Sequence, residues 1–400
     1  MDVLPAAEHK RPSPPSPPAP PGWARHWARQ WRAMLALLSA SGMNCTSGWP
    51  PRPSPVLRWY GCLVLAVRTF HNVQAILELK ASHEDAGKID YNMLLILYDM
   101  GVKLVTSVVS QVVLLVRCED VCLSTECMLL YSRVGRPPVP GAMAVAIVGP
   151  AYMIGLVVMT AASTYVLSAS LTHMLSHVLG DFAPTTAMIF VGIMQLLITA
   201  LHVGLATDGS SHVRGWVSEA EANKSPAAHV GLLRELRVRQ QFLHDMVLHH
   251  NSALGWCYLS CLAHVLMEAV VCLYLGASHL RLLAAEVGYV QPNPLLNPWL
   301  YVWGVFELTV FCGMCVLGQK LSDHHGRMYC VLRGFLVSNP QLCTKTKLEL
   351  QGFAQQIRRQ DNRPGIFGLI HYDLATMKAG FASTVTYIIV LSQFEPTVGH

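Results

Sequence analysis

The sequence is dominated by apolar stretches of about 20 residues, each long enough to cross a bilayer as a helix. A helix satisfies its own backbone hydrogen bonds, so such a stretch is stable where no water is present. Only 13% of the residues are charged, about half the fraction that is usual in a soluble domain. The sequence therefore predicts an all-α membrane protein that crosses the bilayer several times.

Seven stretches qualify as transmembrane helices. They are predicted at 56–77, 91–116, 141–167, 185–206, 252–276, 299–317 and 374–394. An odd number of spans places the two termini on opposite sides of the membrane.

Basic residues decide which side is which. One set of connections contains only Lys80, Lys88 and Arg281. The other set contains nearly all remaining Lys and Arg, in the segments 10–52, 117–136, 214–239 and 320–363. Because positively charged loops stay in the cytoplasm, we expect a cytoplasmic N-terminus and an extracellular C-terminus. A G-protein-coupled receptor has the reverse orientation.

The last predicted span carries a polar and aromatic stripe. At about 100° per residue, its members fall within a sector of roughly 120°: Ser383, Thr386, Tyr387, Val390, Gln393 and Phe394. Such a stripe fits the wall of a pore, where aromatic rings can act as gates. It equally fits helix packing, because Ser and Thr also bond between membrane helices. The residues alone leave both interpretations open.

Ionisable residues within the spans are costly in a bilayer and are therefore candidates for function. Asp99 and Lys103 are spaced i, i+4, which suits an ion pair along one helix face as well as a ligand contact. Arg68, His71 and Glu268 are further candidates.

Trp303 and Glu307 share one face of the sixth span. Aromatic rings beside a carboxylate suit a pocket for a polar small molecule, although aromatic residues at this depth also anchor helices at the membrane interface. The candidate ligand-binding residues are Tyr98, Asp99, Tyr152, Tyr165, Gln195, Trp299, Tyr301, Trp303 and Glu307.

Paired histidines raise one enzymatic alternative. Their groups are similar to the histidine boxes of membrane di-iron enzymes, in which imidazole suits iron: His173 with His177, His244 with His249 and His250, and His324 with His325. The middle group departs from the tighter spacing of that family. The predicted topology also puts the first group on the other side of the bilayer, where it cannot share a metal with the rest. We therefore expect no enzyme, no metal site and no cofactor.

A motif near the end of the chain is more specific. Thr386-Tyr387 and Gln393-Phe394 flank five mostly apolar residues, and several short segments precede them: Leu348-Glu349-Leu350, Phe353-Ala354-Gln355-Gln356, Gly365-Ile366-Phe367-Gly368, Asp373-Leu374 and Gly380. This pattern resembles the last-span signature of insect gustatory receptors, which are relatives of the insect odorant receptors. Ser392 replaces the usual aliphatic residue of that signature, and Ile366-Phe367-Gly368 is a variant of its Gly-Phe-Phe-like turn.

The resemblance implies a ligand-gated, non-selective cation channel of four subunits. The last span of each subunit would line the pore, with Gln393 and Phe394 at the extracellular gate and Ser383, Thr386, Tyr387 and Val390 along the conduit. A sugar or a bitter compound would bind in an outward-opening pocket within each helical bundle. The tetramer would contain this chain alone or other gustatory receptor subunits, in the plasma membrane of sensory neurons and without a nucleic-acid partner. The alternative is a metabotropic seven-helix receptor or a transporter of inverted topology.

The expected organisation has six segments. Residues 1–55 form a Pro-rich cytoplasmic leader that we expect to be disordered, within which three Trp residues have the spacing of an interfacial helix. The other segments are spans one to four (56–207), a cytoplasmic anchor region (208–251), spans five and six (252–317), further anchor helices (318–373), and the pore-lining span with a short extracellular tail (374–400).

Overall fold

The computed structural model describes Ser39, Gly42 and residues 46–47, 52–84, 91–134, 171–220, 226–284 and 298–393. The helices are α2 (Pro55–Glu84), α3 (Tyr91–Val116), α4 (Cys118–Val134), α6 (Leu171–Ala220), α7 (Pro226–Ala284), α8 (Pro298–Ser338), α9 (Thr344–Arg359) and α10 (Leu374–Gln393). Two antiparallel strand pairs join β1 (Thr46–Ser47) to β2 (Arg52–Pro53) and β3 (Gly365–Ile366) to β4 (Ile370–His371). The leader up to residue 38, the third predicted span and Phe394 lie outside the described residues.

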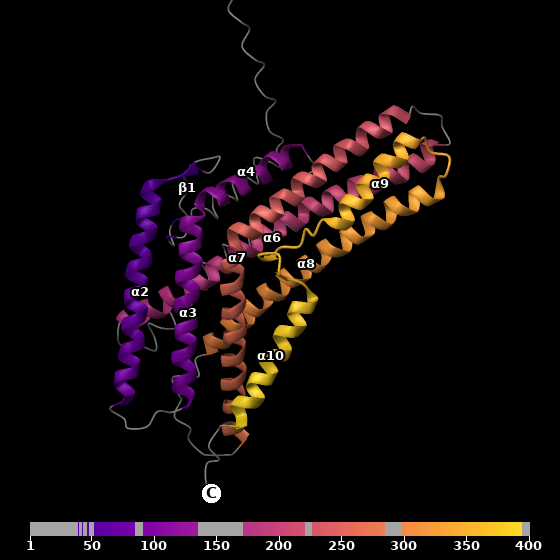
Figure 1. The fold of residues 1–400 in the computed structure, drawn as a ribbon. Coiled ribbons are helices and arrows are strands. Elements are labelled where there is room, and N and C mark those ends of the chain that lie inside the picture. Colours follow the sequence, from indigo (N-terminus) through magenta and orange to yellow (C-terminus); the bar gives the residue numbers. More distant parts are fainter. Residues whose placement is uncertain are drawn as a thin grey trace, which may run out of the picture.

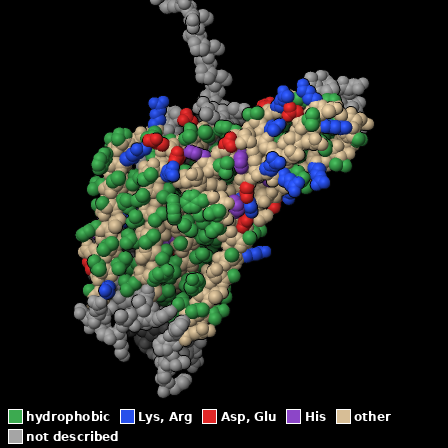
Figure 2. Space-filling model, in the orientation of Figure 1, with side chains coloured by type: hydrophobic (Ala, Val, Ile, Leu, Met, Phe, Trp, Pro, Cys, Tyr) green, Lys and Arg blue, Asp and Glu red, His purple; other side chains and the backbone are tan. Residues whose placement is uncertain are grey.

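Helices α6, α7 and α8 are long, and each of them runs through two regions of the molecule (Figure 1). We call them the membrane block, which contains α2, α3, α10 and residues 184–206, 252–276 and 304–317, and the arm, which contains α9 and residues 207–220, 226–251 and 318–338. Figure 2 shows hydrophobic side chains over the block, with charged side chains gathered at its upper edge and along the arm. This division separates the part that suits a bilayer from the part that suits water.

Five of the described helical stretches are long and apolar enough to cross a membrane. They are Leu97–Val116, Pro184–Val213, Val230–Gly276, Gly304–Ser338 and Leu374–Gln393. They correspond to the predicted second, fourth, fifth, sixth and seventh spans. The predicted first span is helical within α2, but α2 is not among these five.

The long helices continue far beyond the predicted spans. The helix α7 has 59 residues, so it is about 90 Å long, roughly three times the thickness of the hydrocarbon core. Helices α6 and α8 have 50 and 41 residues. Each of these helices therefore forms part of the block and, without a break, part of the arm.

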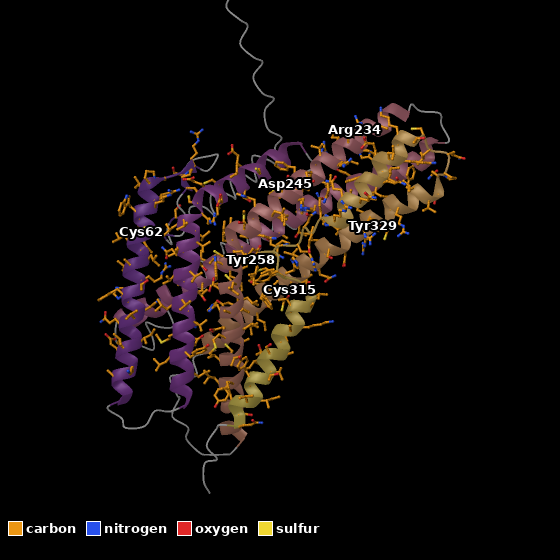
Figure 3. All side chains as sticks on the ribbon, viewed as in Figure 1. Cys62, Arg234, Asp245, Tyr258, Cys315 and Tyr329 are labelled. Carbon is orange, nitrogen blue, oxygen red and sulfur yellow. The ribbon has the colours of Figure 1, made fainter. Side chains whose placement is uncertain are left out.

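The main hydrophobic core lies where α6, α7 and α8 meet. Met194 and Ile198 of α6 are buried in one cluster with Tyr258 of α7 and Phe311 of α8. Figure 3 shows Tyr258 and Cys315 at the junction of the block and the arm. This core holds the three helices in register and supports the start of α10.

The strand pair β3–β4 fastens the start of α10 to α7. Asn251 Oδ1 accepts a hydrogen bond from the Gly365 backbone N–H at 3.0 Å, and the Tyr372 hydroxyl donates to the Tyr258 carbonyl. Burial raises the pKa of Tyr372 well above its usual value, so the phenol remains a donor. Phe367 and Gly368 both have positive φ, at 52° and 72°, as the predicted turn requires.

Glycine is required where α8 passes the segment that leads into α10. A Cβ atom at Gly318 would lie 1.8 Å from the Tyr372 carbonyl oxygen, which no side chain tolerates. The close approach places the start of α10 directly against α8.

Candidate functional site

Five ionisable side chains form a buried group within the membrane block, which we call the ion cluster: Asp99, Lys103, His264, Glu268 and Glu307. Lys103 Nζ lies 3.0 Å from Asp99 Oδ2 and 3.1 Å from Glu268 Oε2. His264 Nε2 lies 2.9 Å from Glu307 Oε2. The side chains of Glu268, His264 and Glu307 are at most 1% exposed, so water cannot stabilise their charges.

Helix geometry brings these residues together from three helices. His264 and Glu268 lie one turn apart on the same face of α7, where His264 contacts Glu307 of α8 and Glu268 contacts Lys103 of α3. Gly304 allows α7 and α8 to approach closely, because a Cβ atom there would lie 2.5 Å from Cys272 Sγ. Thr185 of α6 adds a fourth helix, since its hydroxyl donates a hydrogen bond of 2.7 Å to Glu307 Oε1.

The ion cluster contains three carboxylates, one lysine and one histidine. Buried charges are stable only when they are paired and hydrogen-bonded. Asp99 Oδ1 is nevertheless buried without a hydrogen-bond donor among the described groups. Such an oxygen is an acceptor that a ligand hydroxyl or ammonium group could meet.

The candidate ligand-binding residues lie in different parts of the structure. Asp99 and Glu307 both belong to the ion cluster, and Asp99 forms the ion pair with Lys103 that their spacing suggested. Gln195 lies in the core instead, where its Nε2 donates to the Met314 carbonyl at 2.6 Å. Tyr98 is 64% exposed on another side of α3. Of the remaining candidates, Trp299, Tyr301 and Trp303 lie in the first turns of α8, and Tyr152 and Tyr165 lie outside the described residues.

Sequence reasoning missed two members of this site, His264 and Thr185. His264 precedes the predicted candidate Glu268 by four residues in an apolar stretch, which is a usable signal because ionisable residues are rare there. Thr185 offers no such signal, since threonine is common in membrane helices.

Arg68, another candidate from the sequence, has a packing role. It is 2% exposed, and its Nη1 donates to Gln111 Oε1 at 3.0 Å. Gln111 Nε2 in turn donates to the Gly61 carbonyl at 2.9 Å. This network joins α2 to α3 at a distance from the ion cluster.

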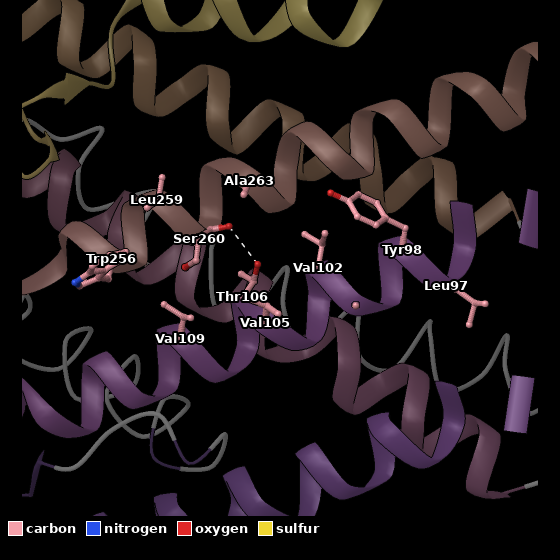
Figure 4. A pocket seen from close by; sticks show the side chains of 11 residues that line it. Leu97, Tyr98, Val102, Val105, Thr106, Val109, Trp256, Leu259, Ser260 and Ala263 are labelled. Atoms are coloured by element: carbon pink, nitrogen blue, oxygen red, sulfur yellow. Dashed lines mark hydrogen bonds between the residues drawn. The ribbon is translucent and has the colours of Figure 1, made fainter. Parts of the chain in front are cut away.

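A cavity of about 530 Å³ lies between α3 and α7. We call it the α3–α7 groove. Figure 4 shows the side chains along its two walls. Its lining residues are Leu97, Tyr98, Gly101, Val102, Val105, Thr106, Val109, Trp256, Leu259, Ser260 and Ala263. The groove is almost entirely apolar, so it does not provide the polar pocket expected from the sequence.

The last helix, α10, packs along one side only. Gly380 and Thr384 are its buried residues, and Leu391 packs against a small core cluster that contains residues of α3 and α7. The described members of the predicted stripe are all exposed: Ser383, Thr386, Tyr387, Val390 and Gln393. The stripe therefore does not serve packing within this chain.

The profile of the 7tm chemosensory receptor family matches residues 143–398, which is more than half of the chain. The chain belongs to this family. No curated protein sequence matches this chain significantly.

Two solved structures have a similar fold. Both are of the insect olfactory receptor OR5 from Machilis hrabei, and one of them is in complex with eugenol. The eugenol complex has a TM-score of 0.65 at 10% identity and covers 93% of this chain and 99% of that chain. The other structure has a TM-score of 0.64 at 10% identity, with coverages of 92% and 98%. At this identity the likeness shows the fold alone.

These findings confirm the predicted family relationship of this chain and its all-α, seven-span membrane fold. Members of the family are receptors rather than enzymes, so the histidine-box enzyme is excluded. Two histidines of the arm have a packing role: His244 Nδ1 and His325 Nε2 contact the Asn362 side chain at 2.5 and 2.6 Å. They join α7 and α8 to the segment that follows α9.

Proposed function

We propose that this chain is a subunit of a ligand-gated, non-selective cation channel that opens when a small tastant, a sugar or a bitter compound, binds within its helical bundle. Four subunits, of this chain alone or with related gustatory receptors, surround a pore lined by α10. The channel lies in the plasma membrane of sensory neurons, with the arm in the cytoplasm and the C-terminus outside.

The faces of α10 are the observation that carries this proposal. The face with Gly380 and Thr384 is buried against the chain's own helices, whereas the polar stripe with Thr386, Tyr387 and Gln393 is exposed. The Thr386 hydroxyl is satisfied by the Ala382 carbonyl, but the polar ends of Tyr387 and Gln393 would be unfavourable in lipid. A water-filled pore at the centre of an assembly satisfies them.

The arm supports an assembly as well. It exposes apolar residues, with Val238 at 69% and Val337 at 71%. In the arm, where water surrounds the chain, such residues favour contact with another subunit.

The ion cluster suits the polar part of a ligand site. A ligand that donates to Asp99 or replaces Lys103 at a carboxylate would change the pairing between α3, α7 and α8. Helix α10 packs on α7 and α8, so a shift of these two helices reaches the pore wall. The ligand opens the channel to the extent that it binds the open arrangement better, and about 1.4 kcal/mol of difference changes the ratio tenfold.

The direction of the helices supports the proposed orientation. Figure 1 shows β1, which precedes α2, at the upper end of the block near the arm, and the end of α10 at the opposite end. The Lys and Arg side chains of the arm make it the cytoplasmic end. The C-terminal end of α10 then faces outward, where the predicted gate residues Gln393 and Phe394 belong.

Whole-cell recording tests the proposal. Cells that express this chain alone are exposed to sugars and bitter compounds while G-protein signalling is blocked. We expect a ligand-evoked cation current, and an antibody should reach a C-terminal tag on unpermeabilised cells. A response that disappears with the G-protein block supports the metabotropic alternative. A tag that is reached only after permeabilisation contradicts the orientation.

A further inference from the structure

The middle of the α3–α7 groove offers no free polar group to a ligand. Tyr98 and Trp256 carry a hydroxyl and an indole N–H at its two ends, and the hydroxyl-bearing residues between them are Thr106 and Ser260. Thr106 Oγ1 donates to the Ser260 carbonyl at 3.2 Å (Figure 4). Ser260 Oγ lies 3.1 Å from Ser110 Oγ and 3.1 Å from the Cys257 carbonyl oxygen. Between its two ends, the groove must therefore bind an occupant through apolar surface.

The groove lies among segments that cross the bilayer. Both walls belong to stretches long and apolar enough to span a membrane, Leu97–Val116 and Val230–Gly276. Hydrocarbon rather than water therefore surrounds its opening. The walls of an empty groove would lack van der Waals contacts. The apolar acyl chains of the surrounding lipids can supply these contacts.

The length of the groove is close to the thickness of one leaflet of the membrane. The lining residues of α3 extend from Leu97 to Val109, a rise of about 18 Å along the helix. One leaflet accounts for about 15 Å of the hydrocarbon core. Within the bilayer, an apolar group of this length is the acyl chain of a single lipid.

The ends and the middle of the groove also suit an acyl chain. Tyr98 and Trp256 flank its two ends and are 64% and 56% exposed, so their rings are available to an occupant. Gly101 opens its middle, because a Cβ atom there would meet no other atom within 4 Å.

We propose that the α3–α7 groove is a lipid site that holds one acyl chain of a bilayer phospholipid as a wedge between α3 and α7. The site is separate from the ion cluster, which lies on a neighbouring side of α3. The groove shares its walls with the helices that Lys103 and Glu268 tie together. Loss of the acyl chain would let α3 and α7 move closer together. Binding of the acyl chain does not depend on the proposed channel activity.

Photolabelling tests the site. The full-length receptor is reconstituted in nanodiscs of phosphatidylcholine that carries a diazirine on one acyl chain. After irradiation, adducts are mapped by mass spectrometry. We expect adducts concentrated on residues of the two groove walls. Gly101→Leu should fill the groove and lower this labelling several-fold.

Gly313→Leu is the matched control. Gly313 lies in α8, is exposed, and also has open space at its Cβ position, but it does not line the groove. Labelling of the groove walls should be unchanged in this variant. If Gly101→Leu fails to give a monodisperse receptor, Ala263→Leu narrows the groove from the α7 wall with the same expected result.

Three outcomes would overturn the proposal. Adducts spread evenly over the exposed faces of α2, α3 and α7 would indicate ordinary lipid contact. Equal labelling of wild type and a well-folded groove-filling variant would show that the groove is not the labelled site. Unlabelled groove walls would mean that another subunit or a water-borne apolar compound occupies the groove.

Discussion

The membrane block and the arm contain the same kinds of charged residue in opposite settings. In the block, Lys103 joins Asp99 and Glu268 with side-chain exposures of 11% or less. In the arm, Arg234 and Arg237 join α7 to α9 through Glu349, and their side chains are 60% and 46% exposed. Both groups connect helices that are far apart in the sequence, but only the second can be solvated by water.

The difference in burial between the two groups of charges indicates different roles for them. An exposed ion pair contributes about 0–1 kcal/mol, because water solvates the charges almost as well as the partner does. A buried ion cluster is costly to form, and an apolar replacement of the whole cluster would often be as stable. We therefore propose that the ion cluster of the block serves ligand recognition or gating, and that the pairs in the arm keep its helices soluble and aligned.

The largest effect is expected when the lysine of the ion cluster is removed. Lys103→Met leaves Asp99 and Glu268 buried without their cation, which should lower the free energy of unfolding by about 3–5 kcal/mol. Denaturant unfolding of the purified receptor in micelles measures this loss. An effect below about 1 kcal/mol, as for an exposed pair, would show that the two regions do not differ in this respect.

The second prediction concerns ligand sensitivity. Glu307→Gln removes a buried charge but retains an oxygen that can accept from Thr185. If the ion cluster contacts the tastant, the dose-response curve should shift by about tenfold, equivalent to ~1.4 kcal/mol, with unchanged single-channel conductance. Glu349→Gln in the arm is the control and should not shift the curve. An unchanged curve for Glu307→Gln would remove this residue from the ligand site.

The third prediction compares two faces of α10. Thr384 and Thr386 both donate to the carbonyl four residues earlier, at 3.0 and 2.8 Å, but only Thr384 is buried. Thr386→Val should change single-channel conductance or ion selectivity by up to a few-fold, because an apolar group then faces the pore. Thr384→Val should leave both unchanged. Equal effects in the two variants would contradict the assignment of the stripe to the pore wall.

The smallest effect is expected in the arm. Arg237 Nε donates to Gln356 Oε1 at 2.9 Å, and its Nη1 lies 3.5 Å from Glu349 Oε2. Because this side chain is partly solvated, Arg237→Met should lower the free energy of unfolding by no more than about 1 kcal/mol. The same unfolding experiment provides a direct comparison with Lys103→Met. A loss as large as that of Lys103→Met would mean that the arm depends on its ion pairs.

Helices with a continuous apolar stretch could be predicted closely from the sequence. The predicted second span, 91–116, coincides with α3 (Tyr91–Val116). By contrast, α4 was missed, because its mixture of cysteines and charged residues lacks a clear apolar pattern. Tertiary contacts stabilise it instead: Cys118 and Cys122 are buried, and Arg58 of α2 lies 3.0 Å from Glu119.

The candidate site was predictable only in part. Asp99 and Lys103 could be paired from their spacing, since residues four apart share a helix face. The contacts of Lys103 with Glu268 and of His264 with Glu307 join different helices, and no spacing in the sequence relates them. For the same reason, Gln195 and Tyr98 were grouped with these residues although the structure places them in the core and in the groove.

The sequence by itself determined the class of the protein, the approximate position of its described spans and the family signature in its last helix. These features depend on local hydrophobicity and on residue order. Only the tertiary structure decided which buried charges meet, which face of α10 stays exposed and where α3 and α7 leave a groove. Those features depend on how closely helices approach, as where Gly304 faces Cys272, and such packing joins residues that are distant in the chain.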